Sequence, residues 1–534
     1  MRRGSPVLSR VQHLATSCLL LGGALQGCMI GPDYKTPPAA VAAKWEQASD
    51  LSVDTGHQEY DEWWHVFNDD TLVKLVNLAY QQNLTLRAAG VRVLEARAQL
   101  GEAIGEFYPQ QQYLNGGLNY THLPTALPYN LAQNTFWSVL FGAQAGWELD
   151  VWGKIRRGIQ SADDSFLGSV ASYDSALVTL TGDVASTYVK IRTSERQLVV
   201  ARENVEKERL AVKIVRARHA GGVATGRDLD QALNVLGATE ATIPQLTVQL
   251  QQQKNALSVL LGIPPGTIDE LLGGSSGIPS APEKAAVGIP ADLLRRRPDI
   301  RNAELLAGAQ CAQIGVSKGE LLPSFSLMGN VGTLATNVNQ ESLTDVFTHK
   351  TLLYQVGPVF QWNILNYGQI TNNVRYQDAK FQELLVNYQN TVLQAQQEVA
   401  DGIISFIQSR QAVVFLTESV EAAQGALRIA IIQYRDGIAD FTTVLTAEQN
   451  LYTAQNNQAI AMGQVPLGLI AAYRAMGGGW QIRLGHDFVP RETAREMEDR
   501  TNWGTLLTPD LMQPKAAGLP APSDTRPLLR PPEW

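Results

Sequence analysis

Four short segments of the chain alternate between apolar and polar residues. They lie at 112–123, 139–149, 324–335 and 353–364. Side chains of a β-strand point alternately to opposite faces, so the pattern predicts four strands, each with one apolar and one largely polar face. Roughly 9–11 residues is the length of a transmembrane β-strand. A soluble β-sandwich would alternate in the same way, but it would not be joined to the helices that the next segments predict.

Each pair of strands is followed by a very long stretch without proline. No proline occurs between Pro128 and Pro244, or between Pro358 and Pro466. In the second stretch, apolar residues recur in alternating steps of four and three, which is the spacing of a coiled-coil seam. The seam consists of Phe381, Leu385, Tyr388, Val392, Ala395, Val399, Gly402 and Phe406.

These stretches predict unusually long helices. A helix over 153–218 would be roughly 100 Å long at about 1.5 Å per residue, which extends well beyond any membrane. Return helices are expected at 226–261 and 440–475. Pro244 and Pro466 should kink or divide them, because proline cannot donate a helical hydrogen bond.

The order of helix, two strands, long helix and return helix occurs twice. Trp147–Ile155 aligns with Trp362–Ile370, and the equivalent Gly153 and Gly368 are 215 positions apart. A long internal repeat means that one structural unit is built twice. We therefore expect a signal peptide, a first repeat, an inter-repeat segment, a second repeat and a partly disordered C-terminal segment. These parts correspond to 1–27, 28–262, 263–288, 289–480 and 481–534.

Four strands cannot close a barrel, and an open strand edge is not viable in lipid. Two chains would give eight strands, whose interior is just filled by side chains, so three chains with twelve strands form the smallest open barrel. We expect such a homotrimeric barrel, with its polar faces lining water. Its apolar faces, which carry Trp147, Phe360 and Trp362, should meet lipid.

The N-terminus has the form of a secretory signal peptide. Arg2 and Arg3 precede a short apolar run that ends at Leu25–Cys28, and this run is too short for a resident membrane helix. Leu-x-Gly-Cys resembles the bacterial lipobox, which implies cleavage before Cys28 and acylation of that residue. Met29 follows instead of the aspartate that retains lipoproteins at the inner membrane. The resemblance therefore implies an anchor in the outer membrane of a Gram-negative bacterium.

Composition narrows the range of functions. The net charge of −8 provides no basic footprint for nucleic acid. The chain has no His-Glu-x-x-His or phosphate-binding-loop motif, so we expect no enzyme, cofactor or metal site. Of the three cysteines, Cys18 leaves with the signal and Cys28 is lipidated, which leaves Cys311 at a buried helical position. Arg295–Arg297 is interpreted as a solvated face or as a source of inter-chain ion pairs.

Several motifs together carry a resemblance to a known family. They are Cys28–Tyr34, Trp147–Gly153, Ile289–Arg301 and Gly477–Trp480. The chain resembles outer-membrane factors of the TolC/OprM superfamily, NodT-type branch, over about 28–480. The resemblance implies an α+β membrane protein in which a trimeric twelve-stranded barrel continues into a coiled-coil periplasmic tunnel. It also implies docking with a periplasmic adaptor and an inner-membrane pump, often of the resistance-nodulation-division type.

The resemblance places gating and docking at the two helix–helix tips. Gly222 and Gly437 mark the tips that dock the adaptor, and a ring of carboxylates in a narrow tunnel would select cations. Thr446 stands where relatives often have Asp. A plainer interpretation makes the glycines and acidic residues helix caps, and both can hold together. The expected constriction residues are Asp228, Asp230, Tyr434, Asp440 and Thr446.

The function implied is passive conduction to the exterior of substrates delivered by the pump and adaptor. The nearest alternative within the fold is the outer-membrane duct of a type I protein secretion system. A structural coiled-coil envelope lipoprotein is a further alternative, but it would not need amphipathic strands. The sequence does not identify the exported substrate.

Overall fold

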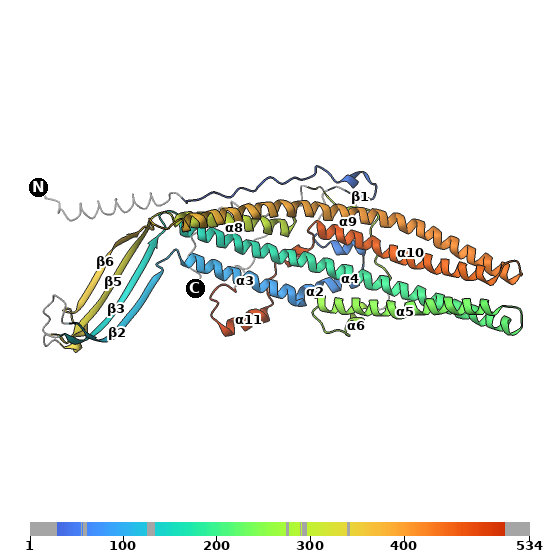
Figure 1. The fold of residues 1–534 in the computed structure, drawn as a ribbon, viewed down its shortest axis with the longest axis horizontal. Helices are drawn as coiled ribbons and strands as arrows, with labels where there is room; N and C mark the ends of the chain where they lie inside the picture. Colours follow the sequence, from blue (N-terminus) through green and yellow to red (C-terminus); the bar gives the residue numbers. More distant parts are fainter. Residues whose placement is uncertain are drawn as a thin grey trace.

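The computed structural model describes residues 29–54, 56, 61–124, 134–273, 277–288, 290, 296–338 and 342–507. The chain is elongated, with a four-stranded sheet at one end and two long helical hairpins that reach the other end (Figure 1). The predicted lipidation site Cys28, residues 291–295 of the Ile289–Arg301 motif and the proline-rich segment 510–534 lie outside the described residues.

Two helical hairpins repeat along the chain, as predicted. The first hairpin joins α4 (Lys154–Ala220) to α5 (Gly226–Leu260), and the second joins α9 (Gln369–Arg435) to α10 (Phe441–Ala475). The two long helices have 67 residues each and the two return helices have 35 each. The shorter helices are α2 (Asp70–Gln82), α3 (Leu84–Gly105), α6 (Ile268–Leu272), α8 (Pro298–Gly319), α11 (Arg491–Arg500), and the 3-10 turns Glu46–Ser49, Trp63–Phe67, Leu343–Phe347 and Trp480–Arg483.

Neither internal proline divides its helix. Pro244 lies inside α5 and Pro466 lies inside α10, and both helices continue on each side. A proline removes one helical hydrogen bond, and a helix of 35 residues retains the bonds of all its other turns. Pro466 is itself buried. The expectation of a divided helix was therefore wrong.

The four predicted strands form one antiparallel sheet in the order β2-β3-β5-β6. Their bounds are Gln111–His122 for β2, Thr135–Leu149 for β3, Ser324–Thr336 for β5 and Leu352–Gln361 for β6. The last strand ends before Trp362, which the alternation had included. After Gln361 the chain turns toward α9 through Tyr367, which has a positive φ of 47°.

The strand register gathers the apolar positions on one face of the sheet. Phe360 pairs with Phe325, which pairs with Leu149, and Trp147 pairs with Leu327. Directly paired residues of neighbouring strands point to the same face, so the period-two patterns of all four strands coincide. The other face is richer in Asn, Gln, Ser, Thr and Gly, with Leu140 and Val359 among its exceptions.

The main core lies where the hairpins meet α2 and the chain ends. The predicted seam of α9 is buried from Tyr388 to Phe406. Two glycines bring α9 and α10 into close contact there. A Cβ atom at Gly402 would lie 2.6 Å from the backbone nitrogen of Ala472, and one at Gly468 would lie 2.7 Å from that of Phe406.

Both ends of the described chain are fastened to this core. Residues 29–45 run in extended form along the helices (Figure 1), and β1 (Val53–Asp54) pairs in parallel with β4 (Ala285–Ala286). The C-terminal part also packs on the core. Arg483 forms a buried ion pair with Asp174, and burial is shared by Phe488, Val489, Met497 and Leu507.

The close packing at Gly402 predicts a position-dependent effect of adding one methyl group. Alanine favours an α-helix over glycine by about 1 kcal/mol. No atom lies within 4 Å of the place a Cβ would take at Gly425, in the same helix. We expect Gly402→Ala to destabilise the protein by about 1–3 kcal/mol through overpacking, and Gly425→Ala to be neutral or stabilising. Thermal unfolding of both variants measures this, and equal melting temperatures would contradict it.

Candidate functional site

The apolar face of the sheet is the first candidate functional surface. Its side chains are largely uncovered in the single chain, with Phe360 71% exposed and Tyr354 and Val356 both 73% exposed. Contiguous exposed apolar surface of this kind marks an interaction with membrane or protein. Trp147 lies on the same face but is half-buried.

Tryptophan side chains fasten the ends of the strands to the helices. The indole nitrogen of Trp147 donates to the carbonyl of Phe107 at 3.0 Å, and that of Trp362 donates to the carbonyl of Leu321 at 3.0 Å. The two tryptophans are equivalent in the repeat. A ring with an apolar body and one satisfied polar tip is typical of a membrane–water interface.

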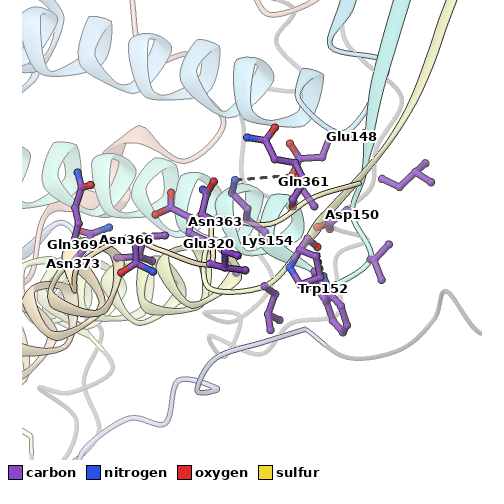
Figure 2. A pocket seen from close by; sticks show the side chains of 18 of the residues that line it. Glu148, Asp150, Trp152, Lys154, Glu320, Gln361, Asn363, Asn366, Gln369 and Asn373 are labelled. Carbon is purple, nitrogen blue, oxygen red and sulfur yellow. Dashed lines mark hydrogen bonds and ion pairs between the residues drawn. The ribbon is translucent and has the colours of Figure 1, made fainter. Parts of the chain in front are cut away.

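The junction between sheet and helices contains a polar pocket of about 720 Å³ (Figure 2). Asp150 receives hydrogen bonds from the backbone nitrogens of Ile155 and Arg156, at 2.9 and 3.0 Å, and so caps α4. Lys154 lies 4.0 Å from Glu148. The rest of the wall combines Glu320 and apolar side chains such as Leu322 and Ile364 with uncharged polar residues. It includes Gln361, Asn363, Asn366, Gln369 and Asn373. This arrangement suits a hydrated passage and contains no nucleophile–base pair.

At the tip of the first hairpin, Thr225 is the N-cap of α5 and the acidic residue Asp228 completes a capping box with it. Gly222 ends α4 with a φ of +75°, which suits glycine. The backbone nitrogen of Thr225 donates to Asp228 at 3.0 Å, and the backbone nitrogen of Asp228 donates to the hydroxyl of Thr225 at 3.2 Å. The bond from the Thr225 backbone nitrogen, and secondly the Thr225 side chain, lower the pKa of the Asp228 carboxyl group. Asp230 is exposed.

The tip of the second hairpin has the same pair of residue types, threonine and aspartate, in the opposite order. Gly437 has a φ of +77°. Here the carboxylate is at the cap position, and Asp440 accepts hydrogen bonds from the backbone nitrogen and the hydroxyl of Thr443, at 3.1 and 2.9 Å. Thr446 is exposed, and its hydroxyl donates to the carbonyl of Thr442. Capping by Gly437, Asp228 and Asp440 is therefore confirmed.

Contacts between the two tips hold the hairpins together. The guanidinium group of Arg218 lies 4.6 Å from the centre of the Tyr434 ring, which is 5.2 Å from the Phe441 ring. The Thr442 hydroxyl donates to Gln231 at 3.2 Å. Tyr434 was expected at the constriction, but its partner Arg218 was not predicted, because the two residues are 216 positions apart in the chain.

Each tip also presents one exposed apolar side chain. Val223 and Ile438 directly follow the two capping glycines and are 75% and 77% exposed. They are equivalent in the repeat. In the sequence, each of them directly follows a glycine that ends a long helix. This signal was available, but the two residues were not predicted to form an exposed apolar surface.

Two other expectations concern charged and metal-binding groups. Arg297 is buried and not solvated, since it pairs within the chain with Asp299 and Glu398 and donates to the carbonyl of Ala475. Cys311 is buried as expected, with its sulfur 3.5 Å from the carbonyl oxygen of Pro32. Among the residues that the structure describes, no group of three or more metal-ligating side chains is present.

An amphipathic sheet at one end and two capped helical hairpins at the other define an outer-membrane channel protein. A family model of outer membrane efflux proteins matches residues 75–263 and 289–478. The chain belongs to this family, and it is the outer-membrane channel of an efflux pump of a Gram-negative bacterium, not an enzyme.

Individual relatives agree with this assignment. The chain is 28% identical to Nodulation protein T of Rhizobium leguminosarum bv. trifolii over 440 residues, which cover 82% of this chain and 91% of that protein. It is also 28% identical to the toluene efflux pump outer membrane protein TtgC of Pseudomonas putida over 488 residues, 88% of this chain and 96% of that protein.

Solved structures show the same fold. The outer-membrane channel OprN superimposes with a TM-score of 0.78 at 29% identity, covering 85% of this chain and all of that one. The open state of the MtrE channel of Neisseria gonorrhoeae gives a TM-score of 0.71 at 25% identity over 85% of this chain and 99% of that one. Of the three functions considered from the sequence, the efflux channel is therefore confirmed.

Proposed function

We propose that three copies of this chain form a twelve-stranded barrel in the outer membrane that continues into a helical tunnel in the periplasm. The observation that carries this proposal is the sheet itself. Its apolar face is exposed, and β2 and β6 each have a free edge in the described chain. Strand edges need hydrogen-bond partners in lipid. Pairing β6 of one copy with β2 of the next supplies them, with the polar faces inside.

The tips, in this proposal, close the tunnel at rest and dock a periplasmic adaptor. Rings of Asp228 and Asp440 would concentrate cations at the narrow end, with Asp230, Tyr434 and Thr446 near the constriction. Val223 and Ile438, exposed beside Gly222 and Gly437, would provide apolar contacts for the adaptor. Because the tips are joined by the contact of Arg218 with Tyr434, we expect opening to require its loss.

The inner-membrane partner would be a pump of the resistance-nodulation-division type. Names of the relatives support small molecules as substrates, since they include a toluene efflux pump protein and an antibiotic efflux pump protein. Substrate choice would belong to the pump, because the pocket and the hydrated strand face carry mixed polar groups without a specific binding arrangement.

Lipidation of Cys28 is supported by the position of Met29 and Ile30, the two residues that follow it. The backbone nitrogen of Ile30 donates to the carbonyl of Trp152 at 3.0 Å, and Arg157 donates to the carbonyl of Ile30 at 3.1 Å. Met29 thereby lies against Gly153, where sheet turns to helix. Acyl chains on the preceding residue would enter the membrane at the level where the barrel ends.

Charge on the two faces of β6 should have unequal effects. In a barrel with its apolar face in lipid, an arginine near mid-bilayer costs about 2–4 kcal/mol, whereas the inner face is hydrated. We therefore expect Val356→Arg, in the middle of β6, to reduce the amount of assembled trimer strongly, and Gln355→Arg, on the polar face, to leave it nearly unchanged. Native mass spectrometry in detergent measures both. A stable monomer or dimer of the wild-type chain would refute the trimer.

The gate can be tested by separating charge from capping at Asp228. Asparagine keeps an oxygen that accepts from Thr225 but removes the negative charge. We expect Asp228→Asn to weaken cation preference in planar bilayers while the tip stays closed. Tyr434→Ala should raise single-channel conductance, because it removes the contacts with Arg218 and Phe441. If both variants conduct like the wild type, while other changes at the tips open the channel, the gate lies elsewhere.

The N-terminal anchor has a direct chemical test. We expect mass spectrometry of the mature N-terminal peptide to show acyl chains on Cys28. Cys28→Ser with a functional signal should abolish the modification but still allow insertion, because the barrel is itself a membrane anchor. Cleavage at another residue, or an unmodified cysteine in the mature protein, would contradict this prediction.

A further inference from the structure

Two glutamates are buried inside the apolar cluster that joins the hairpins near their tips. Glu208 of α4 is 3% exposed and Glu448 of α10 is 8% exposed. The Oε2 atom of each is buried and has no hydrogen-bond partner. An ionised carboxylate is costly to bury without a partner, so these oxygens need a proton or a cation. The cluster around them includes Val212, Val235, Leu427, Val444 and Leu451.

The antiparallel packing of α4 and α10 brings the two glutamates to the same seam. Gln197 donates to Asn456 at 2.9 Å, and Asn204 donates to Gln455 at 2.9 Å. Glu208 follows Asn204 by one helical turn, and Glu448 precedes Gln455 by two. The row of polar residues between the two hairpins thus continues toward the tips with the carboxyl groups of Glu208 and Glu448.

The surroundings contain too little positive charge to hold both carboxylates ionised. The hydroxyl of Thr239 donates to the Oε1 atom of Glu208 at 2.9 Å. Arg209, on the other side of α4, is already paired with Glu206 and Glu240. The positive charge of Lys207 in α4 lowers the pKa of Glu448, but this effect is smaller than that of burial. Arg428 of α9 is exposed. The described part of α9 contributes apolar residues to this cluster.

Burial raises the pKa of both glutamates to about 7. For Glu208, the bond from Thr239 opposes this increase and the charge of Glu240 adds to it. For Glu448, the charge of Glu208 adds to it. A shift of this size means that the folded tips bind protons that the unfolded chain releases.

We propose that Glu208 and Glu448 form a proton-binding site that fastens the first hairpin to the second, and that release of the proton loosens the tips. Protonation removes the charge that is costly to bury and the repulsion between the two carboxylates. Its stabilising contribution is complete below about pH 4.5, the ordinary value for glutamate, and is lost as the pH rises through about 7. The consequence for conductance rests on the proposed gate, but the proton site does not.

Infrared difference spectroscopy of the trimer in detergent detects the proton directly. We expect a band from a buried protonated carboxyl group that disappears with a midpoint near pH 7. Glu208→Gln should shift or remove that band, whereas Glu240→Gln should keep it, because Glu240 is partly exposed and paired with Arg209. Absence of the band in the wild type, or a response to EDTA in its place, would overturn the proposal.

Hydrogen–deuterium exchange of the near-tip peptides tests the loosening. After correction for intrinsic exchange rates, the local opening constant should rise between about pH 5 and pH 7 and then level off, by roughly tenfold per pH unit for each of the two glutamates that loses its proton on opening. Glu208→Gln with Glu448→Gln should remove this slope, since glutamine imitates the neutral acid. Glu240→Gln should retain it. A slope that persists in the double variant would refute the assignment.

Conductance separates this inference from the proposed gate. If the tips close the tunnel, alkaline pH should increase the open fraction in the wild type but not in the double variant. A normal infrared band and exchange slope without any change in conductance would preserve the proton site and reject gating at the tips.

Discussion

Backbone polar groups in hydrocarbon must be hydrogen-bonded, and the organisation of this channel depends on that constraint. Inside the sheet, β3 and β5 have a partner on each side, whereas β2 and β6 have one described partner each. The apolar face is therefore compatible with lipid only after the edges are paired. The register places Leu149, Phe325 and Phe360 on one face of the sheet. Any strand that pairs with a free edge must therefore also place its apolar residues on that face.

The junction between the strands and the helices couples the sheet to the helical part of the chain. Asp150 accepts hydrogen bonds from the first amides of α4. Trp147 donates to the carbonyl of Phe107, between α3 and β2, and Trp152 donates to that of Pro323, just before β5. These bonds couple the strands to the helices. Sixty-seven residues later the same helices meet at the tips, so a small rotation at the junction becomes a displacement at the far end.

Local patterns predicted most of the fold and none of the contacts between distant hairpins. Alternation and the absence of proline were sufficient for four strands and two long helices. The end of β6 was misplaced because Trp362 continues the alternation, yet its indole is held by Leu321 outside the sheet. Arg297 was misread because its partner Glu398 is 101 positions away. Glu208 and Glu448 do not stand out in the sequence pattern of their helices. Their burial is therefore evident only from the packing of the folded chain.

The two tips show how a duplicated unit can keep its local chemistry and change its charge pattern. In the first, threonine caps the helix and Asp228 is three residues further along, whereas in the second Asp440 caps the helix and threonine is three residues further. Both α5 and α10 begin with a hydroxyl–carboxylate pair. The stability of the helix start therefore requires the pair, but either residue can come first. Three residues correspond to about 4.5 Å along a helix. Around a threefold axis, the exchange would give two carboxylate rings at different heights, which spreads the negative charge along the tunnel axis.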